Sequence, residues 1–114
     1  MLNEQMVHTL LSCRDDWYGR LYRKLSGLGF SCPDVPQLRV ATIKVGKRGV
    51  LRLGSYNRKR HELTVGLVTV LSHDFNALIG HEMVHAFQFH IDPKSEHHGE
   101  LFRFLMCSVS GSVA

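Results

Sequence analysis

Residues 72–92 read SHDFNALIGHEMVHAFQFHID, and the interpretation of the rest of the chain follows from this stretch. Its apolar side chains recur every three to four residues, which is the period of an α-helix. They are Phe75, Leu78, Ile79, Met83, Ala86 and Phe87. Ser72 suits an N-cap, and Pro93 disfavours helical geometry at Asp92. The stretch predicts a buried helix because it is apolar on nearly every side.

Two histidines and a glutamate interrupt this helix as His81-Glu82-Met83-Val84-His85. Residues four apart on a helix have β-carbons about 5–6 Å from each other on one face, so two imidazoles can converge on one zinc ion. Glu82 stands beside the pair, where a carboxylate can take a proton from water without binding the metal. The spacing predicts a zinc centre with His81 and His85 as ligands and Glu82 as the catalytic base.

A catalytic zinc usually takes three protein ligands and a water. The candidates for the third ligand follow His85 in the chain: His90, Asp92, Glu96, His97, His98 and Glu100. His90 is expected on the same helix, turned away from the pair. His97 and His98 open the last helix, whose dipole favours the neutral imidazole that a metal binds. Geometry alone leaves the choice between His97 and His98 open.

The segments around this helix predict an α+β fold in a single domain, 1–114. An apolar stripe predicts an N-terminal helix over 3–26, with a kink or break near Ser12-Cys13-Arg14. Alternating, β-branched-rich runs then predict three strands. They are 38–45, 50–55 and 60–65. Short turns between them favour an antiparallel meander. A short C-terminal helix is expected over 101–106, and Gly80 implies close packing or ligand approach.

Positive charge gathers between Asp34 and Glu62, an interval with no acidic residue and eight of the fourteen Lys and Arg. Such a one-signed stretch creates a field that attracts nucleic acid. The residues expected to contact it are Lys44, Lys47, Arg48, Arg52, Arg58, Lys59 and Arg60. Alternatively, these basic residues form a solvated face of the sheet and bind no partner.

Composition narrows the class of protein further. Hydrophobic residues make up 44% and charged residues 21%, which argues against disorder. Three cysteines without a CxxC pair argue against a disulfide framework and a cysteine zinc ribbon. The absence of a signal-peptide pattern and of a long apolar run predicts a cytoplasmic protein with no membrane partner.

Two motifs of the chain resemble those of the SprT-like zinc metallopeptidases, which include the Spartan proteases. They are His81-Glu82-Met83-Val84-His85-Ala86 and His98-Gly99-Glu100-Leu101-Phe102. The resemblance extends weakly over about residues 20–106. It implies a zincin-like minimal core, one Zn²⁺ per chain held by His81, His85 and His98, and Glu82 as the catalytic residue. The resemblance thus selects His98 over His97.

The function implied by the resemblance is hydrolysis of peptide bonds in protein or peptide substrates, with DNA-associated proteins among them. The alternative is a non-catalytic, zinc-stabilised module that binds nucleic acid through the basic segment 39–60. A third hypothesis is a zinc hydrolase that acts on a non-peptide substrate. Candidate oxyanion donors are His97, Tyr56 and His73.

Other zinc peptidase groups fit the spacing less well. Metzincins would need a glycine at position 88 and a histidine at 91, where this chain has Gln88 and Ile91. A gluzincin would use a downstream glutamate, for which Glu96 or Glu100 is the alternative.

Overall fold

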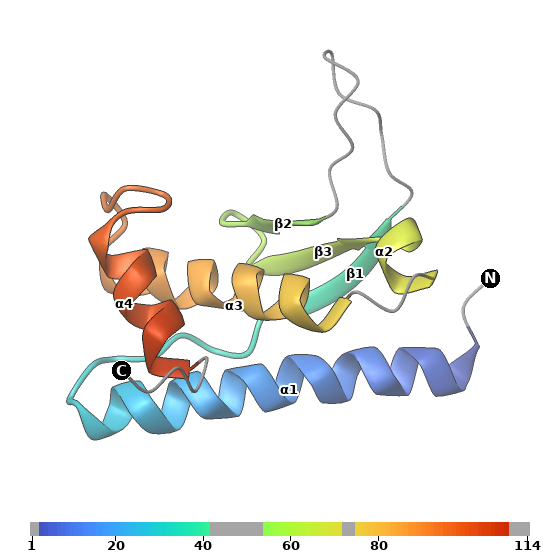
Figure 1. Cartoon of the computed structure of the whole chain (residues 1–114), viewed down its shortest axis with the longest axis horizontal. Coiled ribbons are helices and arrows are strands. Elements are labelled where there is room, and N and C mark those ends of the chain that lie inside the picture. The colour runs from blue at the N-terminus through green and yellow to red at the C-terminus, as the bar shows by residue number, and fades with distance from the viewer. Residues whose placement is uncertain (1–2, 42–53, 72–74, 110–114) are drawn as a thin grey trace, which may run out of the picture.

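The structure is a computed structural model that describes residues 3–41, 54–71 and 75–109. These residues form four helices and a three-stranded sheet (Figure 1). In chain order the elements are α1 (Glu4–Gly27), β1 (Gln37–Ala41), β2 (Gly54–Asn57), β3 (Glu62–Gly66), α2 (Leu67–Leu71), α3 (Phe75–Ile91) and α4 (Glu100–Val109). The predicted α+β class is therefore confirmed, with α2 as an element that the sequence pattern did not predict.

Helix α1 is one continuous helix of 24 residues, so the kink expected near residues 12–14 is wrong. Its N-cap is Asn3, whose side-chain oxygen accepts a hydrogen bond from the Met6 amide at 2.8 Å. Its buried side chains form one stripe: Leu10, Trp17, Leu21 and Leu25. An amphipathic helix of this kind is stabilised mainly by packing that stripe against a partner.

The sheet is mixed, which corrects the predicted antiparallel meander. Its order is β1-β3-β2, with β1 parallel and β2 antiparallel to β3. Strand β3 is central because it pairs with β1 on one edge and with β2 on the other, and Leu63 and Val65 form its buried face. The parallel register places Leu38 beside Leu63 and Val40 beside Val65. Parallel pairing needs a long connection, and residues 42–61 supply it.

Parts of the predicted strands, 42–45 and 50–53, lie outside the described residues, as does the expected N-cap Ser72. Strand β2 extends through Tyr56 and Asn57, where a turn was expected. The helical segments predicted at 72–92 and 101–106 correspond to α3 and α4. No helix in the described ranges is long and apolar enough to span a membrane.

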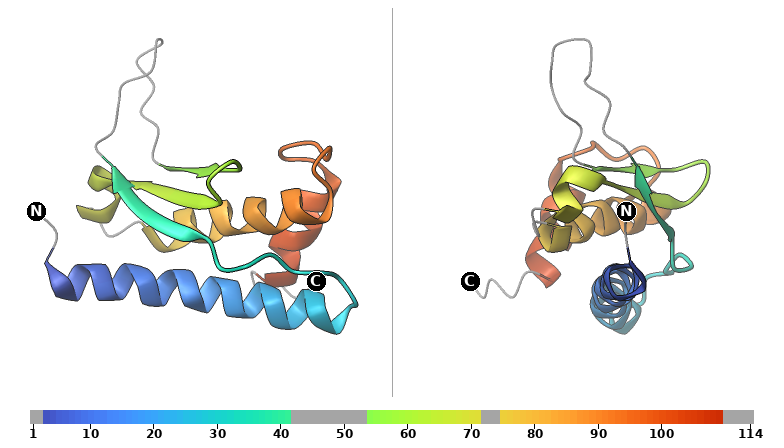
Figure 2. Two further views of the ribbon diagram at one scale, coloured as in Figure 1. Left: turned by 180° about the vertical axis from the view of Figure 1, so that it is seen from behind. Right: turned by 90° about the vertical axis from the view of Figure 1, so that its right-hand side faces the viewer.

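Helix α3 lies between the sheet and α1, and α4 crosses near its C-terminal end (Figures 1 and 2). Close packing of α1 on α3 explains Gly80. A β-carbon at Gly80 would lie 2.6 Å from ring atoms of Trp17. The indole nitrogen of Trp17 also donates to the Asn76 side chain at 3.0 Å. Helix α3 is thus held on two sides, which fixes the position of the residues it carries.

Candidate metal centre

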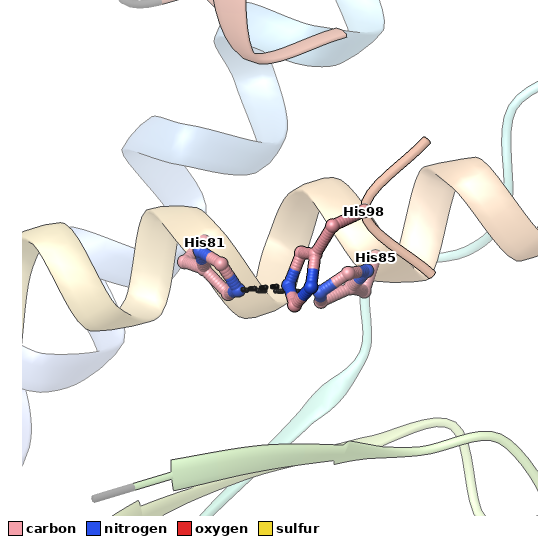
Figure 3. A group of neighbouring side chains, drawn as sticks. All are labelled: His81, His85 and His98. Carbon is pink, nitrogen blue, oxygen red and sulfur yellow. Dashed lines mark hydrogen bonds between the residues drawn. The ribbon is translucent and has the colours of Figure 1, made fainter. Parts of the chain in front are cut away.

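Two structural elements bring three histidines together. Helix α3 presents His81 and His85 one turn apart, and His98 comes from the loop that leads into α4 (Figure 3). His85 is 1% exposed, His81 is half-buried and His98 is exposed. The group therefore lies at the surface of the molecule but is backed by its core.

The ring nitrogens of the three histidines converge. The Nε2 atom of His81 lies 3.2 Å from Nε2 of His85 and 3.2 Å from Nε2 of His98. Nitrogens bound to one tetrahedral zinc at about 2.0–2.1 Å lie about 3.4 Å apart. The ligand atoms of all three residues fall within 4.8 Å of one another. This donor set and its spacing fit a metal ion.

Phe102 packs against all three imidazoles. Its ring centroid is 4.9 Å from that of His81, 4.6 Å from that of His85 and 4.8 Å from that of His98. Phe102 is 8% exposed and belongs to the first turns of α4. The α4 helix thus supplies an apolar wall that limits how far the rings can rotate.

The loop before α4 decides which of the two adjacent histidines joins the group. The Gly99 amide donates to the Glu96 carbonyl at 3.1 Å, and a β-carbon at Gly99 would lie 2.7 Å from the Glu96 β-carbon. This tight turn directs His98 toward α3. His97 instead stacks on His85, with centroids 4.1 Å apart and planes 9° apart. Among the described residues the metal group contains His98 and not His97.

Burial keeps the imidazoles of His81 and His85 in the form that a metal binds. Burial lowers the pKa of His85 to about 4, although the hydrogen bond to Gln88 opposes that change. Burial also lowers the pKa of His81, with further lowering by His98 and His97. Neutral imidazole is the metal-binding form, so neither of these residues has to lose a proton at pH 7.

Glu82 lies on α3 between His81 and His85 and is 8% exposed. Burial raises the pKa of its carboxyl group to about 7. A carboxyl with a pKa near neutrality can both accept and release a proton at physiological pH. The chemistry of a general base is therefore available next to His81.

Gln88 also belongs to the site, although the sequence pattern indicated only that its position does not match a metzincin. It is completely buried, and its side-chain oxygen lies 2.8 Å from Nδ1 of His85. The sequence feature that could have identified Gln88 is its position, since it is an amide three residues after His85 within an apolar helix. That spacing places Gln88 on the same helix face as His85.

Among the described residues, the other candidate metal ligands do not belong to the histidine group. His90 is exposed and lies 3.3 Å from the Ser31 hydroxyl. Tyr56 pairs its hydroxyl with Nδ1 of His61 at 2.7 Å. Glu96 and Glu100 are exposed and do not belong to the histidine group found among the described residues. His73 lies outside the described residues.

Three of the seven residues expected to contact nucleic acid are described, and they form the exposed turn between β2 and β3: Arg58, Lys59 and Arg60. Arg58 is engaged within the protein, since its guanidinium lies 4.3 Å from the ring centroid of Phe89 and donates to the Pro93 carbonyl at 3.0 Å. The remaining four lie outside the described residues: Lys44, Lys47, Arg48 and Arg52.

Comparisons with curated proteins and with solved structures gave no significant match. The model of the SprT-like family, in contrast, matches residues 20–113. That range contains the sheet, α3 and the whole histidine group. On this match the chain belongs to the SprT-like family.

Proposed function

We propose that the protein is a zinc-dependent peptidase with His81, His85 and His98 as metal ligands and Glu82 as the general base. The observation that supports it best is the convergence of three imidazole nitrogens beside a buried glutamate. Zinc, when bound, supplies a Lewis acid that makes water more acidic and polarises a carbonyl group. The donor set favours zinc because imidazole is one of its preferred ligands.

The chain's own residues account for the proton transfers. Glu82 accepts the proton of the attacking water and passes it to the nitrogen of the leaving amine. Its raised pKa suits both steps, since a base near neutrality can reverse its role within one cycle. His81 and His85 stay neutral because burial lowers their pKa values, and Phe102 packs against all three ligand histidines.

A peptide substrate can be held by the sheet. Among the described strands, β2 is paired on one side only, by β3, and it packs against α3. Addition of an extended peptide to such an edge uses main-chain hydrogen bonds and tolerates varied sequences. This mode of binding would bring a peptide alongside the helix that carries His81, Glu82 and His85.

The three-ligand group also favours catalysis over a purely structural role. Structural zinc sites are usually closed by four protein ligands, whereas catalytic sites retain one open position. Within the described ranges the group has three members. A non-catalytic, nucleic-acid-binding zinc module therefore has less support than a hydrolase.

The experiment compares zinc-loaded wild type with the Glu82→Gln variant on a fluorescently labelled, unfolded protein substrate, with and without single-stranded DNA. Loss of the general base should reduce cleavage by about 10²–10⁴-fold while zinc remains bound. Glu4→Gln, on the exposed start of α1, is the matched control and should cleave normally. Absence of cleavage by zinc-loaded wild type under both conditions would contradict the proposal, and equal DNA binding by both proteins would then favour the binding module.

A further inference from the structure

Gln88 is a fully buried amide in the part of α3 that follows the two ligand histidines. An amide buried without partners is costly, so its hydrogen bonds define what it does. Gln88 makes three of them: with Nδ1 of His85 at 2.8 Å, with the Ser95 hydroxyl at 3.1 Å and with the Glu96 carbonyl at 2.6 Å. One side chain therefore joins a ligand histidine to the loop that carries another.

The loop fixes which way the Gln88 amide points. The Glu96 carbonyl can only accept, so the amide nitrogen of Gln88 must face it. The Ser95 hydroxyl donates to the Asp92 carbonyl at 2.8 Å, so it too acts as an acceptor toward Gln88. With both N–H groups used on the loop, the amide oxygen is left to face His85.

This orientation sets the tautomer of His85. An amide oxygen can only accept, so Nδ1 of His85 must carry the ring proton. The other ring nitrogen, Nε2, is then unprotonated, and it is the atom that lies 3.2 Å from Nε2 of His81. Ligand histidines commonly have their tautomer and orientation set by such a hydrogen bond. Here the constraint comes from hydrogen bonds within the chain itself.

The same hydrogen bonds reach His98. The Glu96 carbonyl that accepts from Gln88 also accepts from the Gly99 amide at 3.1 Å. His98 lies between Glu96 and Gly99, so this carbonyl anchors the turn that presents it. A shift of Glu96 away from Gln88 would move the turn and with it His98.

We propose that Gln88 is a positioning residue that prepares the metal centre before metal arrives, by holding His85 as its Nδ1–H tautomer and by anchoring the turn that carries His98. This inference rests on the metal centre of the proposed function but not on peptidase activity. On this proposal, Gln88 couples the position of His85 on α3 to that of His98 in the loop before α4.

The first test reads the tautomer of His85 by ¹⁵N NMR in the metal-free protein at pH 8. Wild type should show the Nδ1–H form alone. Gln88→Met, which keeps the length of the side chain but forms none of these bonds, should show a mixture. Gln88→Glu retains an acceptor for Nδ1–H and should restore the wild-type tautomer, which keeps the test decisive if the methionine variant does not fold. The Nε2–H form in wild type or in Gln88→Glu, or an unchanged tautomer in Gln88→Met, would overturn the proposal.

The second test measures zinc affinity by competition with a chromophoric chelator. Gln88→Met should bind zinc about 10–100-fold more weakly than wild type. Because Gln88 acts partly through the turn of His98, the combined Gln88→Met and His98→Ala variant should lose less than the product of the two single losses. Gln5→Met, on the exposed surface of α1, is the control and should bind as wild type does.

The outcomes separate this inference from the proposed function. Zinc binding by wild type with unchanged affinity in Gln88→Met, or losses that multiply in the double variant, would overturn the inference alone. Failure of wild type to bind zinc would overturn both. Zinc binding without cleavage of any protein substrate would remove the proposed function and leave the role of Gln88 intact.

Discussion

Helices α1 and α3 pack against each other but treat polar side chains in opposite ways. Helix α1 has 24 residues, and its four buried side chains are all apolar. Helix α3 has 17 residues, of which nine are buried, and three of these are polar: Glu82, His85 and Gln88. No charged or amide side chain of α1 is fully buried, whereas the buried polar side chains of α3 must find partners inside the protein.

This difference in buried polar side chains distinguishes residues that stabilise the fold from residues proposed to form the site. A buried leucine in α1 contributes free energy of folding and nothing else that the structure reveals. A buried glutamate or histidine in α3 costs free energy unless it is paired, and this cost is consistent with the chemical role proposed for Glu82 and His85. Substitutions in the two helices should therefore have opposite signatures on stability and on metal binding.

The largest expected effect on stability lies in α1. Leu25→Ala removes a side chain that is completely buried, and it should lower the free energy of unfolding by about 2–5 kcal/mol. Zinc affinity of the folded fraction should not change. Chemical denaturation and chelator competition measure the two quantities. Val7→Ala, an exposed apolar position of the same helix, is the control and should change stability by about 0.5 kcal/mol or less.

Glu82→Gln should stabilise the metal-free protein at high pH. The folded-state pKa of about 7 exceeds the ordinary value of 4.5, so the stability of wild type falls as pH rises from 4.5 to about 7 and then levels off. The variant lacks this loss and should be more stable by about 3 kcal/mol at pH 8, with no difference below pH 4.5. Equal stability of the two proteins at pH 8 would contradict the costly burial of this carboxylate.

Gly80→Ala tests the contact between the two helices. The added β-carbon would clash with Trp17 and should lower stability by about 1–3 kcal/mol, despite the better helix propensity of alanine. In a Trp17→Ala background the same substitution should become neutral or stabilising by about 1 kcal/mol. Gly27→Ala, where a β-carbon meets nothing within 4 Å, is the control. A loss that persists without Trp17 would show that packing against this ring is not the reason for Gly80.

The smallest expected effect is in the exposed turn between β2 and β3, where Arg58 contacts the C-terminal end of α3. Arg58→Ala removes the contact with Phe89 and the hydrogen bond to Pro93, and it should lower stability by about 1 kcal/mol. Lys59→Ala, in the same exposed turn, should change stability by about 0.5 kcal/mol or less. Equal effects at the two positions in thermal denaturation would mean that the Arg58 contacts add nothing to stability.

The sequence alone predicted the elements whose signals are local. The apolar period identified α1 and α3, and the His81, Glu82 and His85 spacing identified the centre of the site, because residues within a few turns of a helix have fixed relative positions. The third histidine of the group could not be predicted in this way. Residue chemistry left His97 and His98 open, and the family resemblance had to choose between them.

Only the tertiary structure decided the features that depend on contacts between distant segments. The parallel pairing of β1 with β3 is a contact between distant segments. The alternation of side chains within each strand does not indicate which strand it pairs with or in which direction. The packing of Trp17 on Gly80 joins residues of two helices. Gln88 acquires its role because the loop after α3 returns to lie against it. Local sequence thus determined the positions of His81 and His85 on the helix, whereas long-range packing determined how His98 reaches them.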